Sequence, residues 1–206
     1  MIIARQFHPD KIAMSESSSK SSAAFAGSRL IAAGSLRDVA LAVKRALASG
    51  AEGPVLTFDD ATGAIVDLDL RGSDADVLAR FGPEGPPDSS RGRGRPKLGV
   101  VAREVTLLPR HWEWLAAQPG GASVALRRLV DQARRADGGA SDARRGREAA
   151  YRFLHATAGD FAGFEEASRA LFANLREAFA ARANAWPADI RAYAIRLAWG
   201  DDASER

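Results

Sequence analysis

A run of glycine, proline and arginine near the middle of the chain restricts its possible folds more than any other feature. Residues 82–99, GPEGPPDSSRGRGRPKLG, show no apolar periodicity and therefore offer no face that a core could bury. Such a composition is typical of a linker. The sequence therefore predicts separate folded units at 23–81, 100–137 and 142–200.

The chain of 206 residues as a whole has a globular composition, 46% hydrophobic and 27% charged. Cysteine is absent, which excludes disulfides and thiolate metal sites, and the three histidines form no i, i+4 pair. We predict no metal or other cofactor. No apolar run approaches the ~20 residues of a membrane span, and no secretory signal is present. We expect a cytoplasmic protein without a membrane partner. Residues 1–22 are serine-rich and expected to be disordered, and Met14 is a second candidate start.

The first unit, 23–81, reads as an α+β fold of order ββαββα, with helices on one face of a small sheet. Its expected elements are a strand pair at 24–32, a helix at 36–47 capped by Ser35, strands at 54–58 and 65–70, and a short helix that Ser73-Asp74-Ala75-Asp76 caps and that ends near Phe81.

Six aspartates crowd this unit, and three interpretations remain open. They are Asp59, Asp60, Asp67, Asp69, Asp74 and Asp76. The first is a divalent cation site, although the calcium-loop spacing is absent. The second is turn and helix-cap chemistry. The third is an acidic face that docks on the basic middle of the chain and competes with an anionic partner.

The middle of the chain is strongly basic. Residues 91–147 contain thirteen lysines and arginines against five acids, a net charge of +8, whereas the whole chain carries only +3. Within it, Arg93-Gly94-Arg95-Pro96 followed by Lys97 resembles the AT-hook core, which lies in the minor groove of A/T-rich DNA. The alternative is a solvated linker that its own charge keeps extended.

Residues 100–137 predict a strand, a helix, a glycine turn and a second helix. The strand spans 100–108, Pro109 suits the first turn of a helix, and Pro119-Gly120-Gly121 ends that helix. We expect Ser123 to cap the second helix, and either Trp112 or Trp114 to be core. The buried stripe of the second helix is expected to comprise Ala125, Leu126, Leu129, Val130 and Ala133.

This order resembles the ribbon-helix-helix DNA-binding domains of Arc-type repressors. The resemblance implies a homodimer whose paired strands enter the major groove, with a phosphate on the amides between Gly121 and Ser123. Counting back from Pro109 turns Arg103, Val105 and Leu107 toward DNA, and the opposite register turns Glu104 and Thr106 outward. We expect Arg103 to approach a base edge in the first register. Arg93, Arg95, Lys97, Arg127 and Arg134 are the predicted phosphate or minor-groove contacts.

Residues 142–200 predict a unit of three helices. The apolar face of the second comprises Phe164, Ala167, Leu171, Leu175 and Phe179, and Pro187 is expected at the first position of the third. His155, Asp160, Glu165 and Glu166 form either an acid–base group or ordinary helix caps and a solvated face. No nucleophile elbow, phosphate loop or zinc-protease motif occurs, so we predict no catalytic residue and no enzyme.

The stretches GFEEASRALF, WPADIRAYAIRLA, FDDATGAIVDLDLRG and REVTLLPRHWEWLAAQPGGASVALRRLV are similar to one bacterial family classed as a domain of unknown function, over about residues 23–200. That resemblance implies no chemistry. The sequence favours a DNA-binding dimer, a regulator or nucleoid-associated protein that acts chiefly through phosphates. The alternative is a protein-interaction or antitoxin-like dimer without DNA contact.

Overall fold

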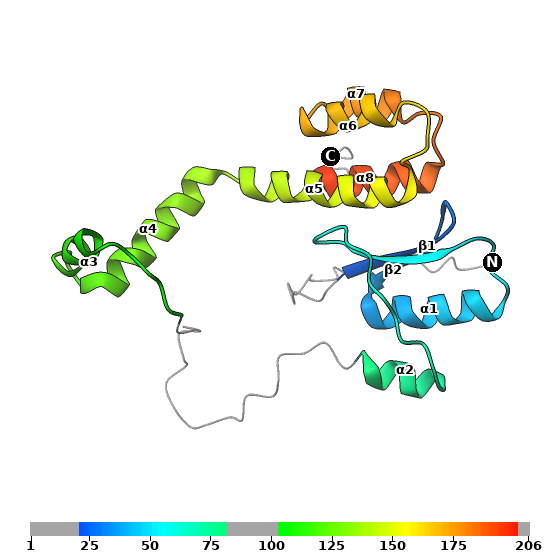
Figure 1. Ribbon diagram of the computed structural model, residues 1–206, viewed down its shortest axis with the longest axis horizontal. Helices are drawn as coiled ribbons and strands as arrows, with labels where there is room; N and C mark the ends of the chain where they lie inside the picture. The colour runs from blue at the N-terminus through cyan, green and yellow to red at the C-terminus, as the bar shows by residue number, and fades with distance from the viewer. Residues whose placement is uncertain (1–20, 82–102, 202–206) are drawn as a thin grey trace, which may run out of the picture.

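The computed structural model describes residues 21–81 and 103–201, and Figure 1 shows them in colour. The predicted N-terminal tail up to residue 20 and the linker, with Arg93, Arg95 and Lys97, lie outside these ranges. The described elements are, in order, β1 Ser21–Ala26, β2 Arg29–Ser35, α1 Leu36–Ala48, β3 Val55–Asp59, α2 Asp74–Arg80, α3 Pro109–Ala116, α4 Gly121–Asp137, α5 Ala140–Thr157, α6 Phe164–Phe172, α7 Arg176–Arg182 and α8 Ala188–Trp199.

The described strands form one antiparallel sheet of order β2-β1-β3. The hairpin between β1 and β2 turns at Gly27, whose φ of +57° favours glycine. Ser35 caps α1, because its side chain accepts the Asp38 amide at 3.2 Å, and Ser73 forms a capping box with Asp76 at the start of α2. The predicted hairpin and both capped helices are confirmed.

The predicted strand at 65–70 is wrong. Ile65 makes an isolated bridge to Phe58, and the Val66 amide donates to the Thr57 carbonyl at 2.8 Å, after which pairing stops. The chain then turns so that Leu68 and Leu70 pack beside the apolar face of α1. The first unit therefore has the order ββαβα. The packing of Leu68 and Leu70 against α1 outweighs the strand pairing that the alternating pattern at 65–70 predicted.

The sheet is covered on both faces, not on one (Figure 1). Side chains on β1 alternate between the two faces: Ala24 packs with Val39 of α1, whereas Ala23 and Phe25 belong to the core formed with α5 and α8. One core thus joins residues 23–81 and 142–200. The sequence predicted these two ranges to be separate units. We call this packed body the globule.

Four helices, not three, make up the C-terminal part. The continuous helix expected through Leu175 is broken at Asn174, whose φ is +58°. Its Oδ1 accepts hydrogen bonds from Trp199 Nε1 at 2.8 Å and from Arg147 Nη1 at 3.2 Å. These contacts hold the reversal that folds α7 back along α6. Pro187 is the N-cap of α8 and not its first helical residue.

Candidate nucleic-acid interface

The described part of the central segment, residues 103–137, projects from the globule as an arm (Figure 1). The arm comprises an extended segment at 103–108, then α3 and α4. It joins α5 through Gly138 and Gly139, whose φ values of +55° and +86° are left-handed. A residue with a Cβ is strained in that conformation, so the sharp change of direction between α4 and α5 requires glycine here.

The turn inside the arm differs from the prediction in its capping residue. Pro109 is at the start of α3 as expected, but α4 begins at Gly121 with Gly120 as its N-cap, at φ +83°. Ser123 lies within the first turn, and its carbonyl accepts Arg127 Nε at 3.2 Å. The Gly121 amide donates to the Gln118 carbonyl at 2.9 Å, so it is not free for a phosphate. The prediction that Ser123 caps the second helix of this segment is therefore wrong.

The arm exposes most of its apolar side chains. Among its described residues only Leu115 and Ala125 are buried, and they hold α3 against α4. The stripe predicted on α4 has the right spacing, but Leu129 and Val130 are 39% and 55% exposed. The prediction that one tryptophan is core is also wrong. The exposed apolar surface of the arm comprises Val105, Leu108, Trp112, Trp114, Val124, Leu129 and Val130.

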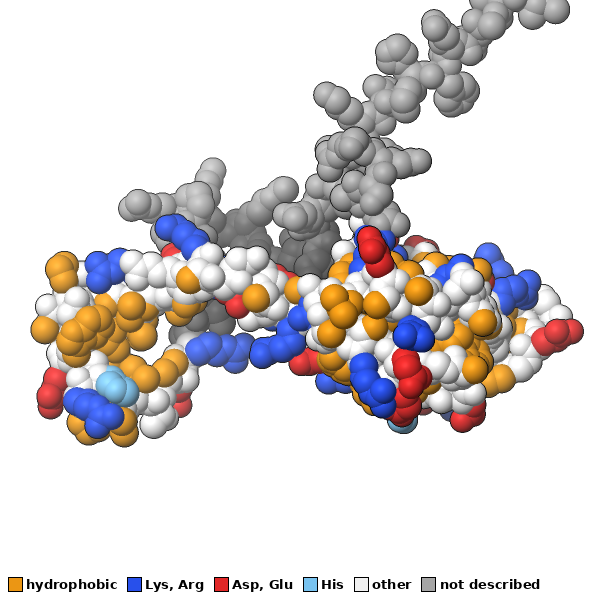
Figure 2. Space-filling view, turned by 90° about the horizontal axis from the view of Figure 1, so that it is seen from above, with side chains coloured by type: hydrophobic (Ala, Val, Ile, Leu, Met, Phe, Trp, Pro, Cys, Tyr) orange, Lys and Arg blue, Asp and Glu red, His pale blue; other side chains and the backbone are white. Residues whose placement is uncertain are grey.

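Figure 2 shows hydrophobic side chains gathered on this arm, beside the larger globule. Soluble monomers rarely leave so many large apolar side chains together in water, and such patches mark interaction sites. The described globule does not cover this surface, because the arm extends away from it (Figure 1).

The strand predicted at 100–108 is not present in its described part, because residues 103–108 are extended but belong to no β-strand. Leu107 is half-buried, whereas Arg103, Glu104, Val105 and Thr106 are all exposed. A shift of one residue reverses both faces of a strand, and exposure on both faces favours neither register. Which of Arg103 and Glu104 would face outward therefore stays a prediction.

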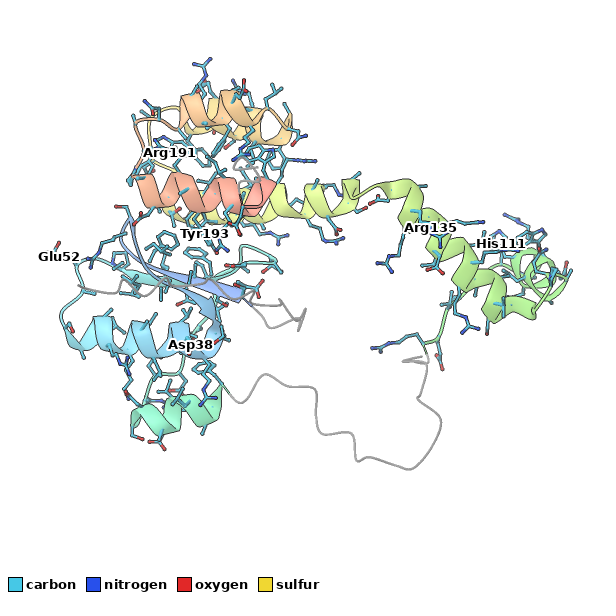
Figure 3. All side chains as sticks on the ribbon, turned by 180° about the vertical axis from the view of Figure 1, so that it is seen from behind. Asp38, Glu52, His111, Arg135, Arg191 and Tyr193 are labelled. Atoms are coloured by element: carbon cyan, nitrogen blue, oxygen red, sulfur yellow. The ribbon has the colours of Figure 1, made fainter. Side chains whose placement is uncertain are left out.

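Six arginines make the arm basic. They are Arg103, Arg110, Arg127, Arg128, Arg134 and Arg135, against four acids. Among the described residues none of the six has an ion-pair partner. Figure 3 labels Arg135 and His111 on this arm. The predicted contacts Arg103, Gly121, Ser123, Arg127 and Arg134 all lie on it, although its two helices do not bring them to a single point.

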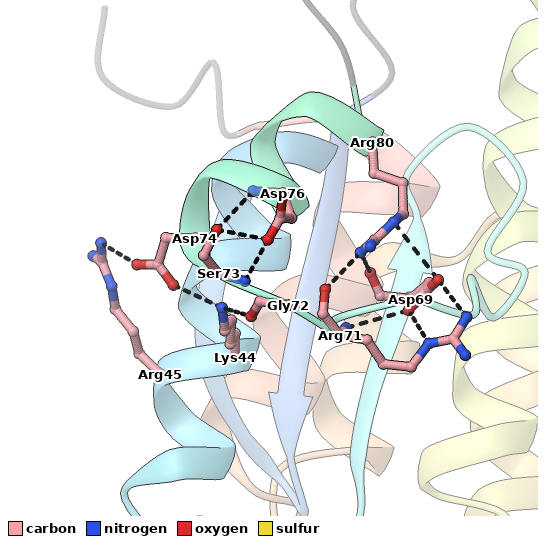
Figure 4. Close-up of polar contacts among 9 residues, drawn as sticks. All are labelled: Lys44, Arg45, Asp69, Arg71, Gly72, Ser73, Asp74, Asp76 and Arg80. Atoms are coloured by element: carbon pink, nitrogen blue, oxygen red, sulfur yellow. Dashed lines mark hydrogen bonds and ion pairs between the residues drawn. The ribbon is translucent and has the colours of Figure 1, made fainter.

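The aspartates of the globule are mostly occupied by internal partners (Figure 4). Asp69 accepts two hydrogen bonds from the Arg71 side chain, both 2.8 Å, which hold the pKa of Asp69 well below its usual range. Lys44 at 2.9 Å lowers the pKa of Asp74. The described residues contain no group of three or more ligands that could hold a metal. These internal contacts favour the interpretation that the aspartates serve turns and helix caps. They do not favour a divalent cation site or an acidic face that docks on the basic middle of the chain.

Asp60 takes part in a contact that sequence reasoning missed. Its carboxylate accepts the Tyr193 hydroxyl at 2.7 Å and pairs with Arg196 at 3.1 Å. Burial, and then this hydrogen bond, raise the pKa of Tyr193 well above its usual range. Figure 3 shows Tyr193 on α8, on the side toward the sheet. The two residues lie 133 positions apart, and neither has a local signal for the pairing.

Comparison with known proteins agrees with the resemblance of the quoted stretches. No helix among the described residues is long and apolar enough to cross a bilayer. No curated protein and no solved structure matches the chain. A family model described as an uncharacterized protein conserved in bacteria, DUF2239, matches residues 21–198. Because that match spans far more than half of the sequence, the chain belongs to this bacterial family.

Proposed function

We propose that the protein is a DNA-binding dimer whose arms pair and whose arginines contact phosphates. The observation that carries the proposal is the exposed apolar surface of the arm, which one chain leaves in water. A second arm would cover it, and the two segments at 103–108 would satisfy each other's backbone groups as paired strands. This arrangement is that of the ribbon-helix-helix domains that the segment resembles.

Pairing two arms also doubles the local positive charge. Each arm contributes six arginines without ion-pair partners among the described residues, and the linker adds Arg93, Arg95 and Lys97 in sequence. Such a surface supplies salt-dependent affinity for any duplex. In one strand register the outward residues would be Glu104 and Thr106, and in the other Val105 and Leu107 would accompany Arg103, so at most one residue of the segment could contact guanine. The binding we propose is therefore mainly phosphate contact with weak base preference.

The dimer is tested by mass measurement of the full chain and a matched pair of variants. Val130→Asp places a charge on the exposed apolar surface of the arm, and Leu175→Asp places one on the α6–α7 turn, where exposure is nearly the same, 55% against 56%. We expect the first variant to be monomeric and the second to keep the wild-type mass. A monomeric wild type, or equal effects of the two variants, would refute arm pairing.

DNA contact is tested by titrating duplexes at several salt concentrations. The logarithm of affinity should fall steeply with the logarithm of salt. Arg127→Gln or Arg134→Gln should flatten that slope by about 0.9 for each phosphate that the protein no longer neutralises. Arg182→Gln, on α7 of the globule, is the matched control and should leave the slope unchanged. Affinity that is absent, or that ignores salt, would exclude phosphate binding.

A dimer without DNA contact is the second candidate, and the exposed carboxylate of Glu104 in the extended segment favours it. A carboxylate on the outer face of the paired strands would repel a phosphate backbone. In that case Val130→Asp would still give a monomer, whereas no duplex would bind at low salt. Glu104→Gln distinguishes the two candidates, because it should strengthen DNA binding only if the paired strands approach DNA.

A further inference from the structure

A second surface with different chemistry lies at the C-terminal end of α5, the end farthest from the arm (Figure 1). Here α5, the loop that follows it and the start of α6 border a cavity of about 470 Å³. The side chains relevant to its chemistry are those of Tyr151, His155, Asp160, Phe161, Phe164 and Glu165. None of these side chains takes part in the proposed DNA contact.

Aromatic rings form the walls of this cavity. The Tyr151 ring centroid lies 6.3 Å from that of Phe164 and 6.1 Å from that of His155, and the Phe172 ring packs against Tyr151 at 5.2 Å. Tyr151, Phe161 and Phe164 are all half-buried, so each ring is anchored in the fold while part of it still meets solvent. Fixed aromatic faces of this kind attract cations through their quadrupole.

The cavity is also acidic. Asp160 and Glu165 line it, and among the described residues neither has a hydrogen-bond or ion-pair partner, in contrast to Asp69 and Asp74 in the N-terminal part. No lysine or arginine among the described residues lines it. The C-terminal end of α5 and the N-terminal end of α6 both border it, and their dipoles oppose each other. The two carboxylates therefore determine the sign of the field.

We propose that this cavity binds an organic cation, a guanidinium or a quaternary ammonium group. Aromatic faces and exposed carboxylates together recognise a large, weakly hydrated cation better than a small metal ion. No group of three or more metal ligands occurs among the described residues, which agrees with this choice. The cation could come from a free small molecule or from an arginine side chain of a peptide, because the chemistry recognised is the same.

The test is an NMR titration of the full chain, following the backbone amide of Gly159 in the loop beside the cavity. The probes are tetramethylammonium, the blocked amino acid N-acetylarginine amide and an arginine-containing blocked peptide, with potassium at equal ionic strength as the reference. We expect saturable shifts with at least one organic cation and none with potassium. Tighter binding of the peptide than of N-acetylarginine amide assigns the source to a polypeptide. Equal affinity for these two probes, or binding of tetramethylammonium alone, assigns it to a free molecule.

Matched variants separate the cavity from general surface charge. Asp160→Asn with Glu165→Gln removes both lining carboxylates, and the affinity for the organic cation should fall about tenfold. Glu166→Gln with Glu177→Gln removes two exposed acids on α6 and α7 that do not line the cavity, and the affinity should stay unchanged. Shifts no larger than those with potassium, or equal losses in the two double variants, would overturn the proposal.

Discussion

Removal of the Tyr193 hydroxyl tests whether the two halves of the globule fold as one unit. Tyr193→Phe deletes the hydrogen bond to Asp60 and leaves the ring in place against Phe25 and Phe153, at centroid distances of 5.2 and 4.6 Å. The buried apolar area is therefore unchanged. The carboxylate keeps Arg196 at 3.1 Å and the Ser21 hydroxyl at 2.8 Å, so it is not left without partners.

A hydrogen bond to a charged group contributes about 1.5–3 kcal/mol, and the remaining partners place the expected loss near the lower end, about 1.5–2 kcal/mol. Asp60→Ala should cost more, about 3 kcal/mol, because it removes both the acceptor of the Tyr193 hydroxyl and the ion-pair partner of the Arg196 guanidinium. Asp60 is largely buried, at 14% side-chain exposure, so solvent screens this contact less than it screens the surface pairs.

The assay is urea unfolding followed by far-ultraviolet circular dichroism and by tryptophan fluorescence. The two probes should give one coincident transition, which moves to lower urea in both variants without a change of slope. A loss under about 0.5 kcal/mol for Tyr193→Phe would refute the value assigned to this hydrogen bond. Separate transitions for the two probes would refute the shared core.

Three further predictions concern the backbone and pH. Asn174→Ala should destabilise the protein by about 1 kcal/mol more than Asn174→Gly in thermal unfolding, because alanine resists the left-handed conformation that glycine accepts; equal losses would contradict this. Gly63→Ala should cost about 2–4 kcal/mol in urea unfolding, because φ is +66° and a Cβ would overlap the backbone of Ala149; a neutral result would mean that the loop shifts easily. Asp69 and Asp74 have folded-state pKa values below their unfolded ones, so their contribution to stability is present above about pH 4 and disappears as pH falls. Measurement of the unfolding free energy at a series of acidic pH values checks this. Asp69→Asn should make the unfolding free energy fall less steeply as the pH is lowered.

Much of the local structure was predictable because its signals lie within a few residues. Ser35 and Ser73 cap α1 and α2 as expected, and Pro109 begins α3. Errors arose where a distant contact outweighed a local pattern. The expected helix through Leu175 breaks at Asn174 because Trp199 and Arg147 bind its side chain.

The candidate interface was predictable in its residues but not in its geometry. The apolar spacing on α4 and the arginine positions follow from the sequence, because helical periodicity is local. Which face of a paired strand would point outward depends on the register, and a one-residue difference reverses the result. Residues 103–108 form no strand in the single chain, so no partner strand sets that register.

By itself, the sequence determined the basic middle of the chain, the linker composition, the capped helices and the absence of thiol chemistry, since each depends only on residue type and near neighbours. Only the tertiary structure decided that residues before and after the arm share one core, with Phe25 of β1 packed on Phe153 of α5 and Tyr193 of α8. The reason is that an apolar face specifies that it must be buried, but not which other face buries it. That choice belongs to long-range packing, which also leaves the arm outside the globule.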